Sequence, residues 1–302
     1  MHKYLSKPTV DILLATLNGE KYLGEQLESL DRQVDVNVRV WVNDDGSTDE
    51  TLAILQKWQE KGLVTNISVT NGIGSTPAFL KLLSEHPNSE YIAFCDQDDI
   101  WDFEKLARQI SALSNEMPIA VTSQRHYIDS SGVVIGKSKK ISGGLSIENA
   151  LIENVVPGNT ILINSQAVRL INRFQNPPIK HYDSWIYLLL SYYGKVICID
   201  TPLLKYRIHE GNLVGLRRYH LRRFIDSAEN FLTQALYLSK TVEFNLGQDK
   251  SPILMNLVSI FEAKSRFRKA YLFLKLPLVR QRRIDLLGMK LIILILVLAR
   301  RS

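Results

Sequence analysis

Residues 91–101 read YIAFCDQDDIW, an apolar run followed directly by a cluster of acids. The apolar run Tyr91–Cys95 is typical of a buried strand, and carboxylates at Asp96, Asp98 and Asp99 follow it directly. Carboxylates this close repel one another, and burying one of them unpaired is costly. A divalent cation removes that penalty, and Mg²⁺ or Mn²⁺ prefers oxygen ligands together with a phosphate. The stretch therefore predicts a strand ending in a metal–diphosphate site; the alternative is a solvated acidic turn before the next helix.

Upstream of this strand, short apolar runs alternate with helical patterns. The predicted strands are Val10–Ala15, Val38–Asn43 and Ile67–Thr70. The predicted helices are Glu20–Arg32, Thr48–Gln59 and Thr76–Glu85. Strand–helix alternation of this kind predicts an α/β fold, a mostly parallel Rossmann-like sheet flanked by helices on both faces.

Downstream of Trp101 the rhythm changes. A turn at residues 129–132 (DSSG) predicts a hairpin between Ile119–Tyr127 and Val133–Ile135. Two more strands, Thr160–Ile163 and Val196–Ile199, flank a helix at 182–192. From Leu216 onward the pattern is helical throughout. We therefore expect a catalytic domain over residues 1–215 and an α-helical C-terminal extension over 216–302.

Composition limits the class of protein. Of 302 residues, 45% are hydrophobic and 23% charged, which is ordinary for a globular protein and excludes disorder and a polytopic membrane protein. Two cysteines, Cys95 and Cys198, make no disulfide framework, so a reducing cytoplasm is expected, and the N-terminus does not resemble a signal peptide. Residues 216–302 hold 17 of the 37 lysines and arginines but 6 of the 31 acids, which predicts an anionic surface partner.

Four polar clusters follow the predicted parallel strands. They are residues 16–19 (TLNG), 43–47 (NDDGS), 71–74 (NGIG) and 96–99 (DQDD). Any one of them is an ordinary loop, because Asn, Asp and Gly favour turns. Ligands bind at the carboxyl ends of strands in open α/β sheets, so four clusters on one rim predict a ligand site. A dinucleotide-dependent oxidoreductase is disfavoured because the first loop lacks the Gly-x-Gly-x-x-Gly pattern.

These motifs resemble a known family. Residues 15–19 (ATLNG), 44–49 (DDGSTD) and 94–101 (FCDQDDIW) resemble the inverting family-two glycosyltransferases of the GT-A fold. Residues 158–160 (GNT), 181–185 (HYDSW) and 206–215 (YRIHEGNLVG) are similar to its rhamnosyltransferase branch, which builds bacterial cell-wall and surface polysaccharides. The resemblance covers about residues 8–215.

The resemblance implies a nucleotide-diphosphate-sugar donor, with dTDP-L-rhamnose foremost, and a polysaccharide or polyprenyl-linked acceptor. It assigns the nucleotide-sugar site to Thr16, Asn18, Asp44, Asp45, Gly74, Asp96 and Arg207. Asp45, with Asp44 as a second acceptor, would take a hydrogen bond from the imide N–H of uracil or thymine, Asp96 would face the ribose, and Arg207 would contact the diphosphate.

The same resemblance implies a cofactor, Mn²⁺ or Mg²⁺, held by Asp98 and His209. It makes Asp183 the catalytic base, which takes the proton of the acceptor hydroxyl. The family pattern usually reads His-Asp-Trp-Trp, and this chain departs from it at residues 181–185. An N-cap role for Asp183 and a surface position for His209 are the structural alternatives.

The C-terminal region alternates apolar stretches with basic clusters. Its apolar run, about residues 284–299, is shorter than the roughly 20 residues needed to span a bilayer. We expect helices lying on an anionic membrane surface, so that the protein is cytoplasmic and peripheral to the cell membrane, with no nucleic-acid partner. A helical bundle packed on the catalytic domain or on a second copy of the chain is the alternative. The functional alternatives are a UDP-hexose donor, for glucosyl or galactosyl transfer, and a non-catalytic membrane-tethering protein.

Overall fold

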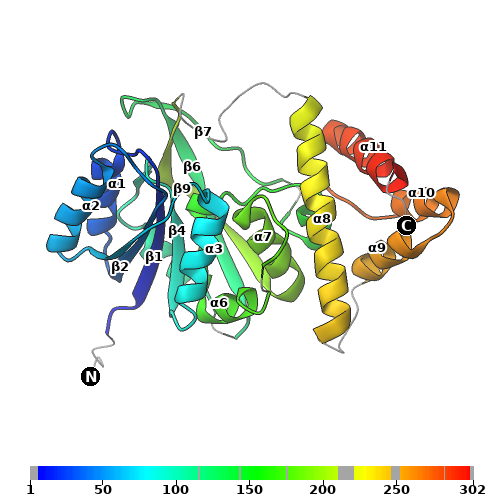
Figure 1. The fold of residues 1–302 in the computed structure, drawn as a ribbon, viewed down its shortest axis with the longest axis horizontal. Coiled ribbons are helices and arrows are strands. Elements are labelled where there is room, and N and C mark those ends of the chain that lie inside the picture. Colours follow the sequence, from blue (N-terminus) through cyan, green and yellow to red (C-terminus); the bar gives the residue numbers. More distant parts are fainter. Residues whose placement is uncertain are drawn as a thin grey trace. The chain divides into compact units, whose positions relative to one another are not determined.

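The structure is a computed structural model that describes residues 6–114, 116–142, 144–174, 176–209, 221–245, 252–281 and 283–299. It divides into two compact units, each described by itself (Figure 1). The first unit comprises residues 1–140, 156–174 and 192–216. The second comprises residues 141–155, 175–191 and 217–302. The second unit thus joins two earlier segments to the C-terminal residues. The sequence predicts instead that the catalytic domain ends at residue 215, and this boundary lies outside the described residues.

The first unit is built on one sheet, with strand order β3-β2-β1-β4-β8-β6-β9-β5 and β7 paired to β6. Its strands are β1 Thr9–Thr16, β2 Asn37–Asp44, β3 Val64–Val69, β4 Tyr91–Cys95, β5 Ile100–Trp101, β6 Ile119–Ile128, β7 Val134–Lys137, β8 Leu162–Asn164 and β9 Lys195–Arg207. Strands β1 to β4 are mutually parallel, and so are β6 and β9. The remaining pairs are antiparallel, because β5, β7 and β8 run against their neighbours.

Helices cover both faces of this sheet. They are α1 Leu23–Asp31, α2 Thr51–Glu60, α3 Ser75–Glu85, α4 Lys105–Ser111 and α6 Ser165–Ile171, with a 3₁₀ turn at Gly158–Thr160. Figure 1 shows α1 and α2 on one side of the sheet and α3 on the other. Strand β1 explains both layers: alternate residues Val10, Ile12 and Leu14 pack in the core that holds the buried leucines of α1, while Leu13 is buried on the opposite face.

The sequence predicts these elements well. The four parallel strands and three helices of residues 9–95 are confirmed with ends shifted by at most three residues, and β4 matches its predicted bounds. The hairpin is confirmed as the β6–β7 pair. The later strands differ more, and β9 continues to Arg207, eight residues beyond the end predicted at Ile199. The strand expected at Thr160–Ile163 starts later, because Gly158–Thr160 forms a 3₁₀ turn, and β5 is too short to carry a periodic signal.

The second unit is helical. Its elements are α5 Ile147–Ala150, most of α7 Tyr182–Tyr193, α8 Leu221–Asn245, α9 Pro252–Glu262, α10 Arg266–Leu274 and α11 Arg283–Ala299. The segment between α10 and α11 is fastened to α5 and the residues after it. Glu153 accepts hydrogen bonds from the backbone N–H of Gln281 (2.8 Å) and from Arg280 (3.4 Å), and Asn149 Nδ2 donates to the Val279 carbonyl (3.0 Å). The C-terminal helices are therefore integrated into a unit with earlier segments of the chain.

None of the described helices combines the length and the apolar character needed to cross a lipid bilayer.

One lysine side chain of the first unit is fully buried. Lys105, in the first turn of α4, is fully buried, with its Nζ 3.6 Å from the centroid of the Trp101 ring and donating to Gln109 Oε1 at 3.1 Å. Burial lowers the pKa of Lys105 to about 7, although the proximity of Cys95 and Asp99 opposes that shift. Between about pH 7 and pH 10.5, Lys105 is therefore protonated in the unfolded chain but not in the folded chain. In that range its contribution makes the free energy of unfolding rise with pH.

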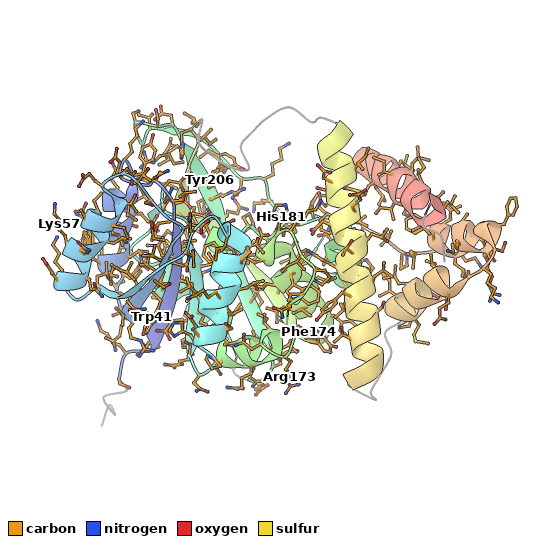
Figure 2. All side chains as sticks on the ribbon, in the orientation of Figure 1. Trp41, Lys57, Arg173, Phe174, His181 and Tyr206 are labelled. Carbon is orange, nitrogen blue, oxygen red and sulfur yellow. The ribbon has the colours of Figure 1, made fainter. Side chains whose placement is uncertain are left out.

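We predict that Lys105→Met stabilises the protein by roughly 1–4 kcal/mol at neutral pH, since it removes a buried charge while keeping an apolar side chain. The gain should be greatest below pH 7 and shrink toward pH 10.5. Thermal unfolding of both proteins across this range tests it. Lys57→Met is the matched control, because Lys57 lies exposed on the outer side of α2 (Figure 2). A gain that does not change with pH would contradict the assignment.

Candidate active site

The site lies where β1, β2, β3 and β4 end, because the carboxyl ends of parallel strands meet at one edge of the sheet. All four loops predicted to form a rim follow these strands. Hydrogen bonds tie the loops to one another.

Asp44 closes the loop after β2. It is fully buried, and its two oxygens accept from the hydroxyls of Thr16 (2.8 Å) and Ser47 (2.6 Å) and from the backbone N–H groups of Ser47 (2.8 Å) and Gly46 (3.2 Å). A carboxylate offers about four acceptor positions, so these four bonds use its capacity. The sequence predicts nucleotide contacts for Thr16 and Asp44. The structure instead pairs these side chains with each other, which fixes β1 against β2.

Asp45 joins the loop after β2 to the loop after β3. It accepts from the N–H groups of Gly74 (2.8 Å) and Ile73 (2.9 Å) and from the Thr70 hydroxyl (2.9 Å). Burial alone would raise the pKa of Asp45, but these hydrogen bonds outweigh it and the pKa lies below its ordinary value. The loop reaches Asp45 through Gly74, whose φ of 83° suits glycine. Asp45 is therefore an ionised acceptor that holds the loop after β3.

The loop after β1 is tied to both neighbours. The Asn18 side chain accepts from the Thr48 N–H (2.9 Å), and the Asn18 backbone donates to Ser47 Oγ (2.8 Å). On the other side, Gln97 exchanges two hydrogen bonds with the backbone of Leu17 (2.8 and 3.0 Å). A Cβ at Gly19 would lie 2.4 Å from Gln97 Oε1, so a larger residue there would displace the Gln97 amide from Leu17. Sequence reasoning missed Gln97 and this role of Gly19, although Gln97 stands inside the acidic motif.

The two predicted metal ligands lie together. Asp98 Oδ2 and His209 Nε2 are 2.7 Å apart, although 111 positions separate them in the chain. Their side chains are 14% and 20% exposed, and the Tyr22 ring packs against the imidazole at 5.0 Å between centroids. A carboxylate and an imidazole this close would be able to supply two ligands to a divalent ion, whose charge would offset that of a diphosphate. Within the described residues, no group of three or more His, Cys, Asp or Glu is placed to hold a metal ion, so the protein offers only this pair.

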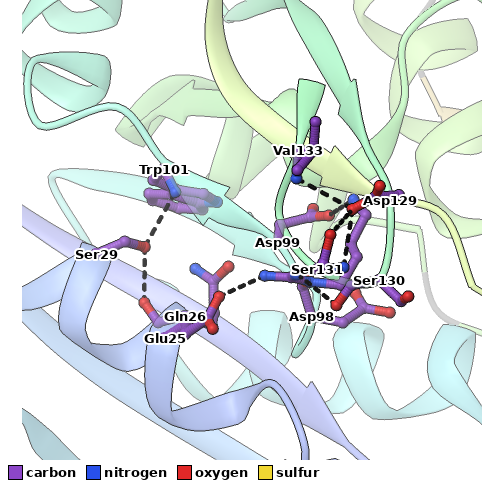
Figure 3. Close-up of polar contacts among 11 residues, drawn as sticks. Glu25, Gln26, Ser29, Asp98, Asp99, Trp101, Asp129, Ser130, Ser131 and Val133 are labelled. Carbon is purple, nitrogen blue, oxygen red and sulfur yellow. Dashed lines mark hydrogen bonds and ion pairs between the residues drawn. The ribbon is translucent and has the colours of Figure 1, made fainter. Parts of the chain in front are cut away.

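Arg207 is buried next to this pair. Its side chain is 1% exposed, and its guanidinium donates to the backbone carbonyls of Asp98 (3.0 Å) and Ser130 (3.3 Å) and to Glu25 Oε2 (2.5 Å). Figure 3 labels these three partners. The prediction that Arg207 contacts the diphosphate does not match this buried position. Arg207 instead holds the loop that carries Asp98 against α1 and the hairpin. Glu25 was not predicted; one Glu on an amphipathic helix gives no distinguishing signal.

Asp99 completes the support of the loop. It is fully buried and accepts from Asn159 Nδ2 (2.5 Å) and from the backbone N–H of Arg207 (3.2 Å). Burial raises the pKa of Asp99 well above its ordinary value, and the negative charges of Asp96 and Asp98 add to that rise. The GNT motif at 158–160 therefore supports the acidic loop. Asp96 itself is half-buried beside Gln97.

Asp183 belongs to the second unit. The helix that carries it, α7, begins at Tyr182, so Asp183 lies in the first turn rather than at the N-cap position, and its carboxylate is half-buried. The next residue is anchored within the same unit, because Ser184 Oγ accepts from Gln234 of α8 at 2.8 Å. Glu153, the nearest acid upstream, is already engaged by Arg280 and Gln281.

Comparison with known proteins identifies the family. The model of Glycosyl transferase family 2 matches residues 11–177, more than half of the chain. The chain belongs to this family. It is therefore a glycosyltransferase, and its α/β sheet with additional C-terminal helices is the GT-A fold.

Individual relatives are more distant. The chain is 29% identical over 216 residues to the dTDP-rhamnosyl transferase RfbG of Shigella flexneri, covering 67% of this chain and 73% of the relative. It is 24% identical over 237 residues to the UDP-Glc:alpha-D-GlcNAc-diphosphoundecaprenol beta-1,3-glucosyltransferase WfgD of Escherichia coli, covering 76% and 90%. Among solved structures, the mannosyltransferase PcManGT of Pyrobaculum calidifontis, in complex with GDP-Man and Mn²⁺, has a similar fold, with a TM-score of 0.57 and 18% identity over 98% and 77% of the two chains.

The buried position of Arg207 yields a prediction. Arg207→Lys keeps the charge but cannot donate to Asp98, Ser130 and Glu25 at once, so the Asp98 loop should loosen and the apparent Mn²⁺ affinity should fall about 10–100-fold. Turnover of a nucleotide sugar against Mn²⁺ concentration measures this. Glu25→Gln should have a smaller effect, because Glu25 is 56% exposed, and Glu28→Gln, in an exposed ion pair on the same helix, should have none. An unchanged Mn²⁺ dependence in Arg207→Lys would rule out this positioning role.

Proposed function

We propose that the protein transfers a sugar, with inversion, from a nucleotide-diphosphate donor to a polysaccharide or lipid-linked glycan, and that the donor is dTDP-L-rhamnose. The observation that carries the proposal is the pairing of Asp98 with His209 on a rim where Asp45 remains an ionised acceptor. Together these groups offer a cation site for a diphosphate and an acceptor for a pyrimidine imide. The similarity to RfbG, a dTDP-rhamnosyl transferase, supports the choice of sugar.

In this proposal each residue has a distinct task. Asp45 accepts from the imide N–H of the base, and Asp96 from a hydroxyl of the pentose. Asp98 and His209 hold Mn²⁺ or Mg²⁺, which when bound offsets the negative charge of the diphosphate. Asp183 takes the proton from the acceptor hydroxyl as its oxygen attacks the anomeric carbon opposite the leaving nucleoside diphosphate.

A UDP-hexose donor is the second candidate, and the similarity to WfgD, which uses UDP-Glc, favours it. Asp45 cannot distinguish the two donors, because thymine and uracil present the same imide and differ by one methyl group. Asp96 can contribute, since uridine has a 2′-hydroxyl and thymidine does not. The preference of the protein for one donor over the other therefore depends on contacts to the pentose and to the transferred sugar.

A donor panel tests the proposed specificity. The protein is incubated with Mn²⁺ and dTDP-L-rhamnose, UDP-glucose or UDP-galactose, and release of the nucleoside diphosphate is measured. We expect release from dTDP-L-rhamnose above that from either UDP-sugar, and loss of release in excess chelator. Preferential hydrolysis of a UDP-hexose would establish the second candidate instead. Undiminished release in chelator would contradict the cation site.

Asp183→Asn tests the base. Asparagine keeps the shape of the side chain but cannot accept the proton, so transfer to an acceptor should fall about 10²–10⁴-fold while the affinity for the donor nucleotide stays unchanged. Asp226→Asn, at an exposed position of α8, is the matched control and should transfer normally. Near wild-type transfer by Asp183→Asn would assign the proton to another group.

The lipid-linked acceptor in this proposal places the reaction at a membrane. WfgD acts on a diphosphoundecaprenol-linked sugar, and this relative covers 76% of the chain. An acceptor of that kind stays in the bilayer, so an enzyme that extends it gains from residence at the surface. We therefore propose that the protein is peripheral to the cytoplasmic face of the cell membrane.

A further inference from the structure

Helix α10 carries large apolar side chains on its exposed face. Phe267 is 90% exposed, Tyr271 58% and Leu274 59%. Their spacing of four and three residues puts them on one side of the helix. The other side is already packed, since Lys269 and Phe273 are buried and α10 contacts α9 and α11. The exposed apolar face is therefore additional to the face that stabilises the unit.

Helix α11 repeats this arrangement. Leu287, Leu291 and Ile295 are 73%, 59% and 57% exposed and follow one another at intervals of four residues. Met289, Ile293 and Val297 are buried on the inner face. Soluble helices normally place charged and polar residues on the face opposite the core. Here the outer face is apolar as well, in a helix of 17 residues, which is shorter than a membrane span.

The charge around these faces is positive. Lys264, Arg268 and Lys275 are exposed beside the apolar face of α10, and Lys275 Nζ lies 4.3 Å from the centroid of the Tyr271 ring. In the stretch 263–299 Asp285 is the single acidic residue. Two copies of this surface would bring like charges together, whereas anionic headgroups would neutralise them. An aromatic and aliphatic face with a cationic border fits the boundary between headgroups and acyl chains.

We propose that the outer faces of α10 and α11 are a docking surface for a bilayer that contains anionic phospholipid. Phe267, Tyr271, Leu274, Leu287, Leu291 and Ile295 enter the headgroup region, and the neighbouring lysines and arginine contact the phosphates. The inference rests on the proposed function in one respect: membrane binding brings the enzyme to a lipid-linked acceptor. The binding itself is measurable without any sugar transfer.

Point variants suit the test better than truncation, because residues 279–281 are integrated into the fold of the second unit. The full-length protein is sedimented with vesicles of phosphatidylcholine alone or with phosphatidylglycerol. Leu287→Ser/Leu291→Ser/Ile295→Ser and Phe267→Ser/Tyr271→Ser should each lower the partition coefficient at least tenfold. The matched control is Val133→Ser/Val134→Ser/Ile135→Ser, since these side chains are 60%, 50% and 56% exposed in the first unit, and it should bind like the wild type.

Charge and function are tested separately. Arg268→Gln/Lys275→Gln should reduce binding to vesicles with phosphatidylglycerol and leave the weak binding to phosphatidylcholine unchanged. Donor hydrolysis, measured without vesicles, should be normal in every variant. If the wild type hydrolyses a donor but does not bind vesicles, the docking surface is wrong and the proposed function stands. If it binds vesicles but hydrolyses no nucleotide sugar, the proposed function is wrong and the docking surface stands. Serine variants that bind vesicles normally but lose self-association in light scattering would show that a second copy covers these faces.

Discussion

The hydrogen bonds of the Arg207 guanidinium hold the other parts of the site in place. The guanidinium bonds to the Asp98 carbonyl, the Ser130 carbonyl and Glu25, and so joins the end of β9, the acidic loop after β4, the β6–β7 hairpin and helix α1. A buried cation with these partners fixes an acidic loop that would otherwise repel itself. Since Arg207 is two residues from His209, the same contact sets the imidazole next to Asp98.

The remaining loops follow the same physical rule, that buried carboxylates need donors. Asp44, Asp45 and Asp99 are each buried, and each is satisfied by hydrogen bonds from a neighbouring segment. These bonds connect the ends of β1, β2, β3 and β4 into one rim. Among these acids Asp44 and Asp99 are fully buried and hold the loops, whereas the Asp98 carboxylate is 14% exposed and meets His209.

Much of the fold could be predicted from the sequence, because its signals are local. Strand β4 is an unbroken apolar run and the first three helices have regular apolar spacing, so their positions follow from periodicity. The site was predicted less completely. Side-chain type does not reveal whether Arg207 or Asp44 points to a ligand or to the protein, and Glu25 lies 182 positions from its partner. The second unit gathers three separate segments, an arrangement set by long-range contacts such as Glu153 with Gln281.

In the proposed function, Asp98 and His209 hold a divalent cation together with a nucleoside diphosphate. Electron paramagnetic resonance of Mn²⁺, titrated into the protein with and without dTDP, tests it most directly, because free Mn²⁺ loses its signal on binding. We expect the wild-type protein to bind one Mn²⁺ more tightly in the presence of dTDP, and both Asp98→Ala and His209→Ala to lose that coupling while their melting temperatures stay near that of the wild type. Equal coupling in the wild type and both variants would contradict the account.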